Sequence, residues 1–160
     1  MRVFLLSFVI LLAMEKPQDE HFVGKVVQKI LLVKNNQVLI TRDSREIVWE
    51  LPGGRLNLGE GPELGVVREV MEELGVSIAV GSPVYINQFA HTADNTPALV
   101  IVYVATLADE PQEFVVDPVE VAQMQWVDAD TWNTYEYYPE YAAALKTYFQ
   151  NVWLPTIFVL

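Results

Sequence analysis

The sequence contains no cysteine and few basic residues. The absence of cysteine excludes disulfide bonds and metal sites built on thiolates. Ten Lys and Arg stand against 21 Asp and Glu, which gives a formal net charge of −11. A sequence-independent grip on a nucleic-acid backbone requires clustered Lys and Arg, so the composition argues against a nucleic-acid duplex as a partner. A small nucleotide bound through a metal ion remains compatible with this charge.

The rest of the composition is typical of one globular domain. The chain has 160 residues, of which 52% are apolar and 19% are charged, and this length is sufficient for a substantial core. No internal repeat or low-complexity segment is visible in the sequence. We therefore expect a single domain over residues 22–150, with a short segment on each side of it.

Both flanking segments are apolar. Residues 1–14 form an apolar run behind a single Arg; the run is too short for a comfortable membrane span, and no small-residue cleavage site follows it. Three interpretations of the 1–21 lead-in stay open: a targeting or anchoring segment, an extra element packed on the domain, and a non-native extension before Met14. The tail, residues 151–160, docks on the domain, meets a partner or is a further extension. We expect a cytoplasmic protein without membrane attachment, with export or tethering through the N-terminus as the alternative, and a homodimer stays open.

Apolar patterning predicts a chain that is mainly extended. Strands are expected at residues 22–33, 38–42, 47–51, 76–80, 84–90, 98–107 and 124–127, with a further short strand at 114–116. Asn35 and Asn36 predict a hairpin turn after the first strand, on which Lys25 and Lys29 are expected to be exposed. The nearly continuous apolar run at residues 99–104 predicts a central strand that is covered on both faces.

Two helices are expected, at residues 62–74 and 139–150. Four apolar residues of the first recur at helical spacing and are expected to face the core: Val67, Val70, Met71 and Leu74. Glu69, Glu72 and Glu73 share the remaining surface at spacings of three and four, which brings their carboxylates together. Like charges near a helix C-terminus are unfavourable, and Arg68 offsets only one of them. A hard divalent cation with oxygen ligands, Mg²⁺ before Ca²⁺ for a phosphate substrate, would resolve the conflict.

These acidic residues belong to a spaced motif. Gly54 is followed after five residues by Glu60, and after seven more by the sequence REVMEELGV at residues 68–76. On these residues the chain resembles the Nudix hydrolase family, whose box is Gly, five residues of any kind, Glu, seven of any kind, then Arg-Glu-aliphatic-any-Glu-Glu-any-Gly-aliphatic. Every required position agrees. The sequence WELP at residues 49–52 and the strand order around the box extend the resemblance over residues 22–150.

The resemblance implies a fold, an activity and a metal. The expected fold is of the α/β class, an α/β/α sandwich with a mixed sheet. The expected activity is Mg²⁺-dependent hydrolysis of a diphosphate bond in a nucleoside diphosphate linked to another moiety: a nucleoside triphosphate, a nucleotide sugar or ADP-ribose. Mn²⁺ is the alternative metal. A non-catalytic nucleotide-binding or regulatory module with the same fold is the alternative function, but it predicts eroded metal carboxylates, and none of them is missing.

The resemblance also implies roles for individual residues. The expected metal ligands and their supports are Gly54, Glu60, Glu69, Glu72 and Glu73. The expected catalytic group consists of Glu69 and Glu73, Arg68 as the residue that orients the carboxylates, and Glu120. Glu120 lies in the loop before a Trp-containing strand, where the family often carries a further metal ligand or base; Asp117 is its rival. The candidates for substrate binding are Arg42 and Arg55, which suit a polyphosphate, and Trp49, which suits a base.

Overall fold

The computed structural model describes residues 21–90, 95–109 and 113–151. The expected N-terminal lead-in and C-terminal tail therefore lie outside the described residues, apart from His21 and Asn151. The elements are β1 (Lys25–Lys34), β2 (Gln37–Arg42), α1 (Pro62–Leu74), β3 (Ile78–Ala90), β4 (Pro97–Leu107), β5 (Gln123–Val127), a short 3₁₀ helix (Trp132–Thr134) and α2 (Pro139–Asn151). In the described residues, no helix has the length and apolar character needed to cross a membrane.

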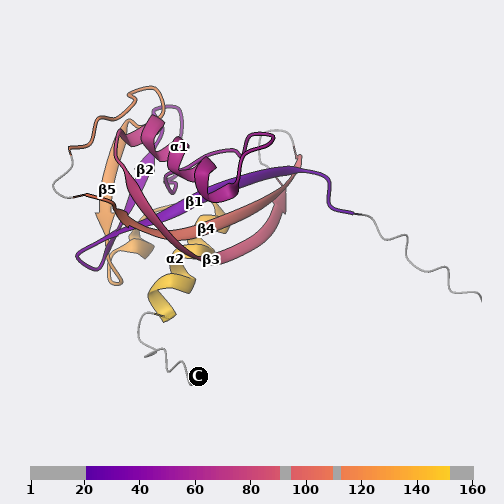
Figure 1. The fold of residues 1–160 in the computed structure, drawn as a ribbon. Coiled ribbons are helices and arrows are strands. Elements are labelled where there is room, and N and C mark those ends of the chain that lie inside the picture. The colour runs from indigo at the N-terminus through magenta and orange to yellow at the C-terminus, as the bar shows by residue number, and fades with distance from the viewer. Residues whose placement is uncertain (1–20, 91–94, 110–112, 152–160) are drawn as a thin grey trace, which may run out of the picture.

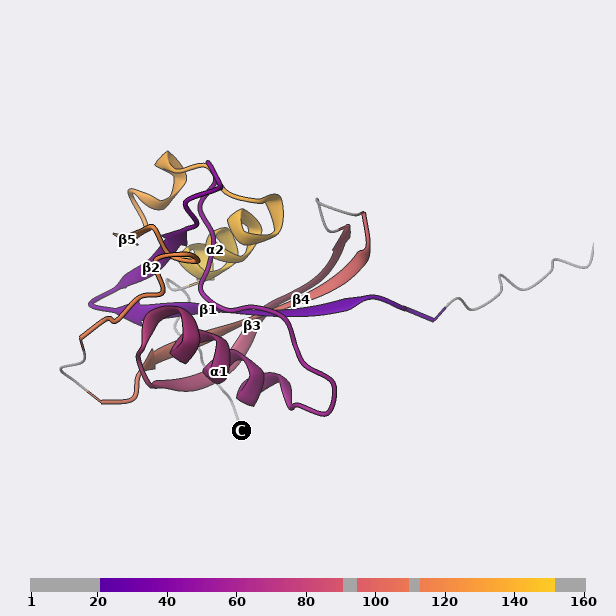
Figure 2. The same ribbon diagram turned by 90° about the horizontal axis from the view of Figure 1, so that it is seen from above.

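The strands form one mixed sheet between two helices. The strand order is β3-β4-β1-β2-β5. β1 runs parallel to β4, and the other neighbouring pairs are antiparallel. Figures 1 and 2 show α1 on one face of this sheet and α2 on the other. The expected α/β/α sandwich with a mixed sheet is therefore confirmed.

The central strands are buried on both faces. Along β1, Ile30 and Leu32 join the core under α1, whereas Leu31 joins the core under α2. β4 alternates in the same way, with Val102 toward α2 and Tyr103 toward α1. Because side chains alternate between the two faces of a strand and both faces are covered, these strands read as nearly continuous apolar runs. The prediction of a covered central strand at residues 99–104 is confirmed.

Helix α1 has the predicted bounds but a different buried stripe. Val66, Val70 and Leu74 are fully buried, Val67 is partly buried, and Met71 is 44% exposed. The expectation that Met71 faces the core is therefore wrong. The buried stripe consists of residues spaced by four: Val66, Val70 and Leu74. Met71 follows Val70 directly and is therefore rotated by about 100° around the helix axis from the middle of this stripe.

The strand predictions need three corrections. The segments at 76–80 and 84–90 belong to one strand, β3, which continues through Pro83 with irregular register against β4. The segment at 47–51 makes only isolated bridges, from Glu50 to Thr41 and from Trp49 to Tyr137. The segment at 114–116 is not a strand, because the Val115 amide donates to the Leu74 carbonyl at the end of α1 (2.9 Å). The segments at 47–51 and 114–116 therefore lack the continuous pairing with a neighbouring strand that would make them strands.

Candidate functional site

A glycine turn places the start of the candidate site beside β1. The backbone of residues 52–54 runs along this strand, with the Ile30 amide donating to Pro52 and the Gln28 amide to Gly54, each at 2.9 Å. Gly53 has a φ of +119°, and a Cβ there would lie 2.4 Å from the Gln28 carbonyl oxygen. The turn therefore requires glycine, both for its backbone conformation and for its close approach to the strand.

The same turn meets two carboxylates of α1. A Cβ at Gly54 would lie 2.4 Å from the carboxylate carbon of Glu69, so the absence of a side chain admits this carboxylate. The Gly53 amide donates to Glu73 Oε2 at 2.9 Å. The Gly54 carbonyl, an expected metal ligand, accepts the hydrogen bond from Gln28.

Arg68 gathers three of the predicted acidic residues. Its Nε donates to Glu60 Oε1 (2.9 Å), its Nη1 to Glu72 Oε2 (3.0 Å), and its Nη2 pairs with Glu69 Oε1 (2.9 Å). A second bond from Nη2 to Glu60 Oε2 (3.1 Å) makes the Glu60 pair bidentate. These contacts raise the pKa of Arg68 further above its ordinary value, and hydrogen bonding to Arg68 lowers the pKa of Glu60. Arg68 therefore contacts three of the four acidic residues of the motif.

Glu73 is held apart from this group. Burial raises the pKa of Glu73 to about 7; Lys29 and the Gly53 amide oppose the rise, whereas the charges of Glu120 and Glu69 add to it. The loop that carries Glu120 returns toward α1. The loop is attached there by the Asp117 amide, which donates to the Glu73 carbonyl at 3.0 Å.

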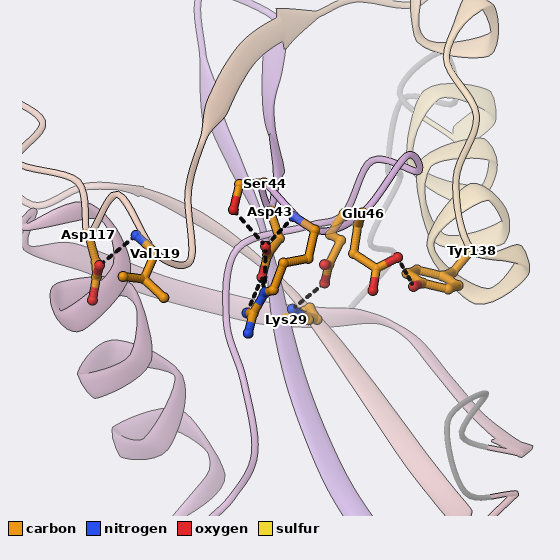
Figure 3. Close-up of polar contacts among 9 residues, drawn as sticks. Lys29, Asp43, Ser44, Glu46, Asp117, Val119 and Tyr138 are labelled. Atoms are coloured by element: carbon orange, nitrogen blue, oxygen red, sulfur yellow. Dashed lines mark hydrogen bonds and ion pairs between the residues drawn. The ribbon is translucent and has the colours of Figure 1, made fainter.

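The structure separates Glu120 from its rival. The Asp117 carboxylate accepts a hydrogen bond from the Val119 amide at 2.8 Å (Figure 3) and thereby stabilises its own turn. Glu120 is exposed, and its charge acts on Glu73. Of these two carboxylates, that of Asp117 is engaged in a turn, whereas that of Glu120 is exposed.

The carboxylates suit a divalent cation in their chemistry. As they are arranged, no three acidic or histidine side chains in the described ranges surround a point where a metal ion would sit, because Arg68 draws Glu60, Glu69 and Glu72 toward itself. The set nevertheless consists of oxygen donors with an excess of negative charge over the single Arg68, which hard cations prefer. Gly54 lets the Glu69 carboxylate approach the turn closely, which puts the Gly54 backbone beside this oxygen donor.

A pocket of about 290 Å³ adjoins the turn on the side of α2. It is lined by Val27, Lys29, Glu46, Glu50, Gly54, Arg55, Phe89, Tyr138, Glu140 and Tyr141. Of the three expected substrate contacts, only Arg55 lines it. Arg42 lies over the ring of Trp49, 5.5 Å from its centroid, and donates to Gln123 Oε1 (2.7 Å). Arg42 and Trp49 therefore contact each other outside this pocket.

Lys29 is the pocket residue that the sequence analysis placed wrongly. It was expected on the surface, but it is 6% exposed. Its Nζ donates to the Gly53 carbonyl (2.5 Å) and to Glu50 Oε2 (3.2 Å), and it lies 5.5 Å from the centroid of the Tyr141 ring. Burial alone would lower the pKa of Lys29, but Tyr141, Glu50 and Glu73 together raise it. The period of two along β1 puts Lys29 on the face of Leu31, and this signal predicts the burial once α2 is known to cover that face.

Comparisons with known proteins agree with the motif and the fold. The model of a family described as the NUDIX domain matches residues 24–148. A MutT-like protein of Streptomyces ambofaciens is 40% identical over 75 residues, which are 44% of this chain and 47% of the relative. A protein of Bacillus subtilis named as a putative 8-oxo-dGTP diphosphatase is 36% identical over 59 residues, 37% of this chain and 40% of the relative. The chain thus spans less than half the length of these curated relatives.

Solved structures share the fold. The solution structure of the Escherichia coli ORF135 protein matches with a TM-score of 0.67 and 18% identity, over 83% of this chain and 94% of that one. A crystal structure of a UDP-X diphosphatase matches with a TM-score of 0.66 and 19% identity, over 86% of this chain and 68% of that one. At these identities the likeness establishes the architecture alone.

Proposed function

The chain belongs to the Nudix family, and from this membership we propose that it is a pyrophosphohydrolase that cleaves a diphosphate bond in a nucleoside diphosphate linked to another moiety, with Mg²⁺ as its metal. The observation that carries the proposal is the arrangement of the box. Arg68 holds Glu60, Glu69 and Glu72 on one guanidinium, while the Gly53 amide holds Glu73. A non-catalytic module has no need of so many carboxylates in one place.

The residues divide the work of metal binding. Glu69, Glu72 and Glu73 would hold the ion together with the Gly54 carbonyl, and Glu60 would act through its bidentate bonds to Arg68. When bound, a divalent cation neutralises phosphate charge and lowers the pKa of an attacking water. Arg68 keeps the carboxylates oriented by five hydrogen-bonding or ionic contacts to oxygen, one of them to the Arg55 carbonyl.

Proton transfer and phosphate binding fall to the surrounding groups. Glu120 and Glu69 are the two candidates for the base that takes a proton from the water, and such a base acts from within about 3 Å in the complex. Arg55 lines the pocket next to Gly54 and is suited to a phosphate oxygen. The hydrogen bond from the Gly53 amide to the Glu73 carboxylate connects the turn to the helix.

Two substrate classes follow from this chemistry. Hydrolysis of a nucleoside triphosphate would release a monophosphate and pyrophosphate, whereas hydrolysis of a nucleotide sugar or ADP-ribose would release a monophosphate and a phosphorylated second moiety. Relatives carry names of both classes, including an 8-oxo-dGTP diphosphatase of Escherichia coli and a putative ADP-ribose pyrophosphatase of Bacillus subtilis. The family membership therefore does not choose between them.

Product identification tests the proposal. The purified protein is incubated with Mg²⁺ and a panel of nucleoside triphosphates, nucleotide sugars, ADP-ribose and dinucleoside polyphosphates, and the phosphorus-containing products are identified by ³¹P NMR. We expect cleavage of a diphosphate bond in at least one class, and no cleavage when the metal is removed with EDTA. An intact panel at high protein concentration in Mg²⁺ and Mn²⁺ would contradict the proposal.

A further inference from the structure

The pocket beside Gly54 contains a buried ammonium next to a carboxylate. Lys29 Nζ lies 3.2 Å from Glu50 Oε2 and 2.5 Å from the Gly53 carbonyl oxygen. These two bonds leave the third N–H of Lys29 without a hydrogen-bond acceptor in the part of the chain that the structure describes. Within that part, Glu50 Oε1 likewise accepts no hydrogen bond. The pair therefore offers a ligand one donor and, beside it, the acceptors of a carboxylate.

We propose that the Lys29–Glu50 pair recognises the Watson–Crick edge of a guanine-type base, a purine with a 6-oxo group and a 2-amino group. This inference rests on the proposed function, because it names the nucleotide that the same site would take. Guanine presents an acceptor, O6, followed by two parallel donors, N1–H and the 2-amino group. Lys29 donates to O6, and the two donors meet the carboxylate of Glu50. Bidentate bonding to a carboxylate is strong and specific in geometry.

Other bases complement the pair less well. Adenine offers one donor beside one acceptor, so the second carboxylate function stays unused. Hypoxanthine lacks the 2-amino group and loses one bond to Glu50. Uracil has an acceptor on each side of its donor, so one carbonyl oxygen would face the carboxylate. An unmatched polar group in a desolvated pocket is unfavourable. The pair therefore selects guanine because guanine forms the most hydrogen bonds and places donors, not acceptors, opposite the carboxylate.

The rest of the pocket suits a base with its phosphates toward the carboxylates. Aromatic rings of Phe89, Tyr138 and Tyr141 line it, and enzymes commonly read a base by edge hydrogen bonds between such rings. Tyr138 is fixed by a hydrogen bond to Glu46 Oε2 at 3.1 Å, drawn in Figure 3. Gly54 and Arg55 line the same pocket, and Gly54 also lies against the Glu69 carboxylate. A base at Lys29 and Glu50 therefore has its phosphate end beside the predicted metal ligands.

Binding of nucleoside monophosphates tests the inference without requiring hydrolysis. GMP, IMP and AMP are titrated into the wild-type protein by isothermal titration calorimetry in the presence of Mg²⁺. GMP is expected to bind about tenfold or more tightly than IMP, which lacks one charge-assisted hydrogen bond, and more tightly than AMP. In Glu50→Gln the ratio of GMP to IMP affinity falls toward one. Glu136→Gln removes the same charge from an exposed side chain outside the pocket and keeps the wild-type ratio.

The outcomes separate this inference from the proposed function. Equal affinity of the wild-type protein for GMP and IMP, or tighter binding of AMP, overturns the guanine assignment whatever the variants do. An unchanged ratio in folded Glu50→Gln overturns the role of Glu50. Guanine-selective binding without hydrolysis of any nucleotide supports the inference and contradicts the proposed hydrolase, whereas hydrolysis with no preference among the bases does the reverse.

Discussion

Arg68 and Glu73 have different roles although they lie only five residues apart on α1. The guanidinium of Arg68 has donors enough for Glu60, Glu69 and Glu72, and it is never deprotonated in proteins. Glu73 lies on the side toward β1, where its carboxylate accepts from Gly53 and is close to the charge of Lys29. Three carboxylates are thus oriented by a side chain and one by the backbone.

The raised pKa of Glu73 predicts a pH-dependent stability of the metal-free protein. Its pKa is about 4.5 when unfolded and about 7 in the folded protein, mainly because of burial. Between these values the folded state binds more protons, so the free energy of unfolding falls as the pH rises from 5 to above 7. The contribution is at most about 3 kcal/mol, since each pKa unit corresponds to about 1.4 kcal/mol, and Glu73 remains partly accessible.

Urea unfolding between about pH 5 and pH 8 in EDTA measures this effect. Glu73→Gln is the matched variant, because it keeps the shape and removes the titration. We expect the wild-type protein to lose more stability than the variant across this range. Parallel pH profiles for the two proteins would show that burial of Glu73 does not carry the predicted cost.

Residue burial was the least predictable property of the site. The motif identified Glu60, Glu69, Glu72 and Glu73 from spacing alone, and the structure brings three of them to Arg68. The burial of Lys29 depends on α2, which is more than a hundred residues away in sequence. Because no residue near Lys29 in sequence indicates this cover, a charged residue in a strand is predicted to be exposed. The mutual packing of Arg42 and Trp49 is a similar tertiary contact that no local pattern reveals.

At the scale of elements, the end of α1 is fixed by Gly75 and the loop that crosses it. Gly75 has a φ of +66°, and its amide donates to the Met71 carbonyl. A Cβ there would lie 2.8 Å from the Val115 carbonyl oxygen. The same loop satisfies the carbonyls of Leu74 and Glu73 through the amides of Val115 and Asp117. One glycine therefore ends the helix and admits the loop that carries Glu120.

Gly75→Ala is expected to destabilise the protein by about 1–2 kcal/mol or more, because a left-handed conformation is unfavourable for a residue with a Cβ and this Cβ meets backbone. The urea midpoint measures the loss. Gly61→Ala, at the other end of α1, is the control: its φ is −75° and a Cβ there has no heavy atom within 4 Å. Equal losses of stability in the two variants would contradict the assigned role of Gly75.

Element boundaries were predicted correctly where residues close in sequence determine them. Pro62 and Gly75 mark the two ends of α1 in sequence, and the prediction of residues 62–74 is confirmed. The hairpin turn at Asn35 and Asn36 is confirmed as well, with φ values of 50° and 61°. The strand at 47–51 was predicted from an apolar run alone, but its formation depended on a partner strand, and only isolated bridges form.

At the scale of the whole molecule, the sheet separates two kinds of chemistry. Helix α1, which carries the acidic residues of the motif, lies on one face, and α2 lies on the other (Figure 2). The pocket with Lys29 and Glu50 is lined by Glu140 and Tyr141 of α2. The turn at residues 53–54 contacts both, through Glu69 and Glu73 on one side and Lys29 on the other. The pocket and the predicted metal site therefore adjoin the same turn.

The overall architecture was predictable because the Nudix box and the strand order agree. What the sequence could not supply is the relation between the two faces, since it arises where α2 returns to the sheet. It also could not supply a choice among substrates, because Lys29 and Glu50 become neighbours only in the folded chain. The motif therefore predicts the fold and a metal site, whereas the proposed base recognition depends on a contact that forms only in the folded chain.

The central claim is that the carboxylates of α1 support metal-dependent hydrolysis, and the turnover of Glu73→Gln tests it most directly. The rate of Mg²⁺-dependent product formation is compared among wild type, Glu73→Gln and the surface control Glu136→Gln on the best substrate of the panel. The account predicts a loss of about a hundredfold or more in kcat for Glu73→Gln, on the scale of losing a group that stabilises developing charge, with an intact fold and a wild-type rate for Glu136→Gln. A wild-type rate in Glu73→Gln would contradict the account.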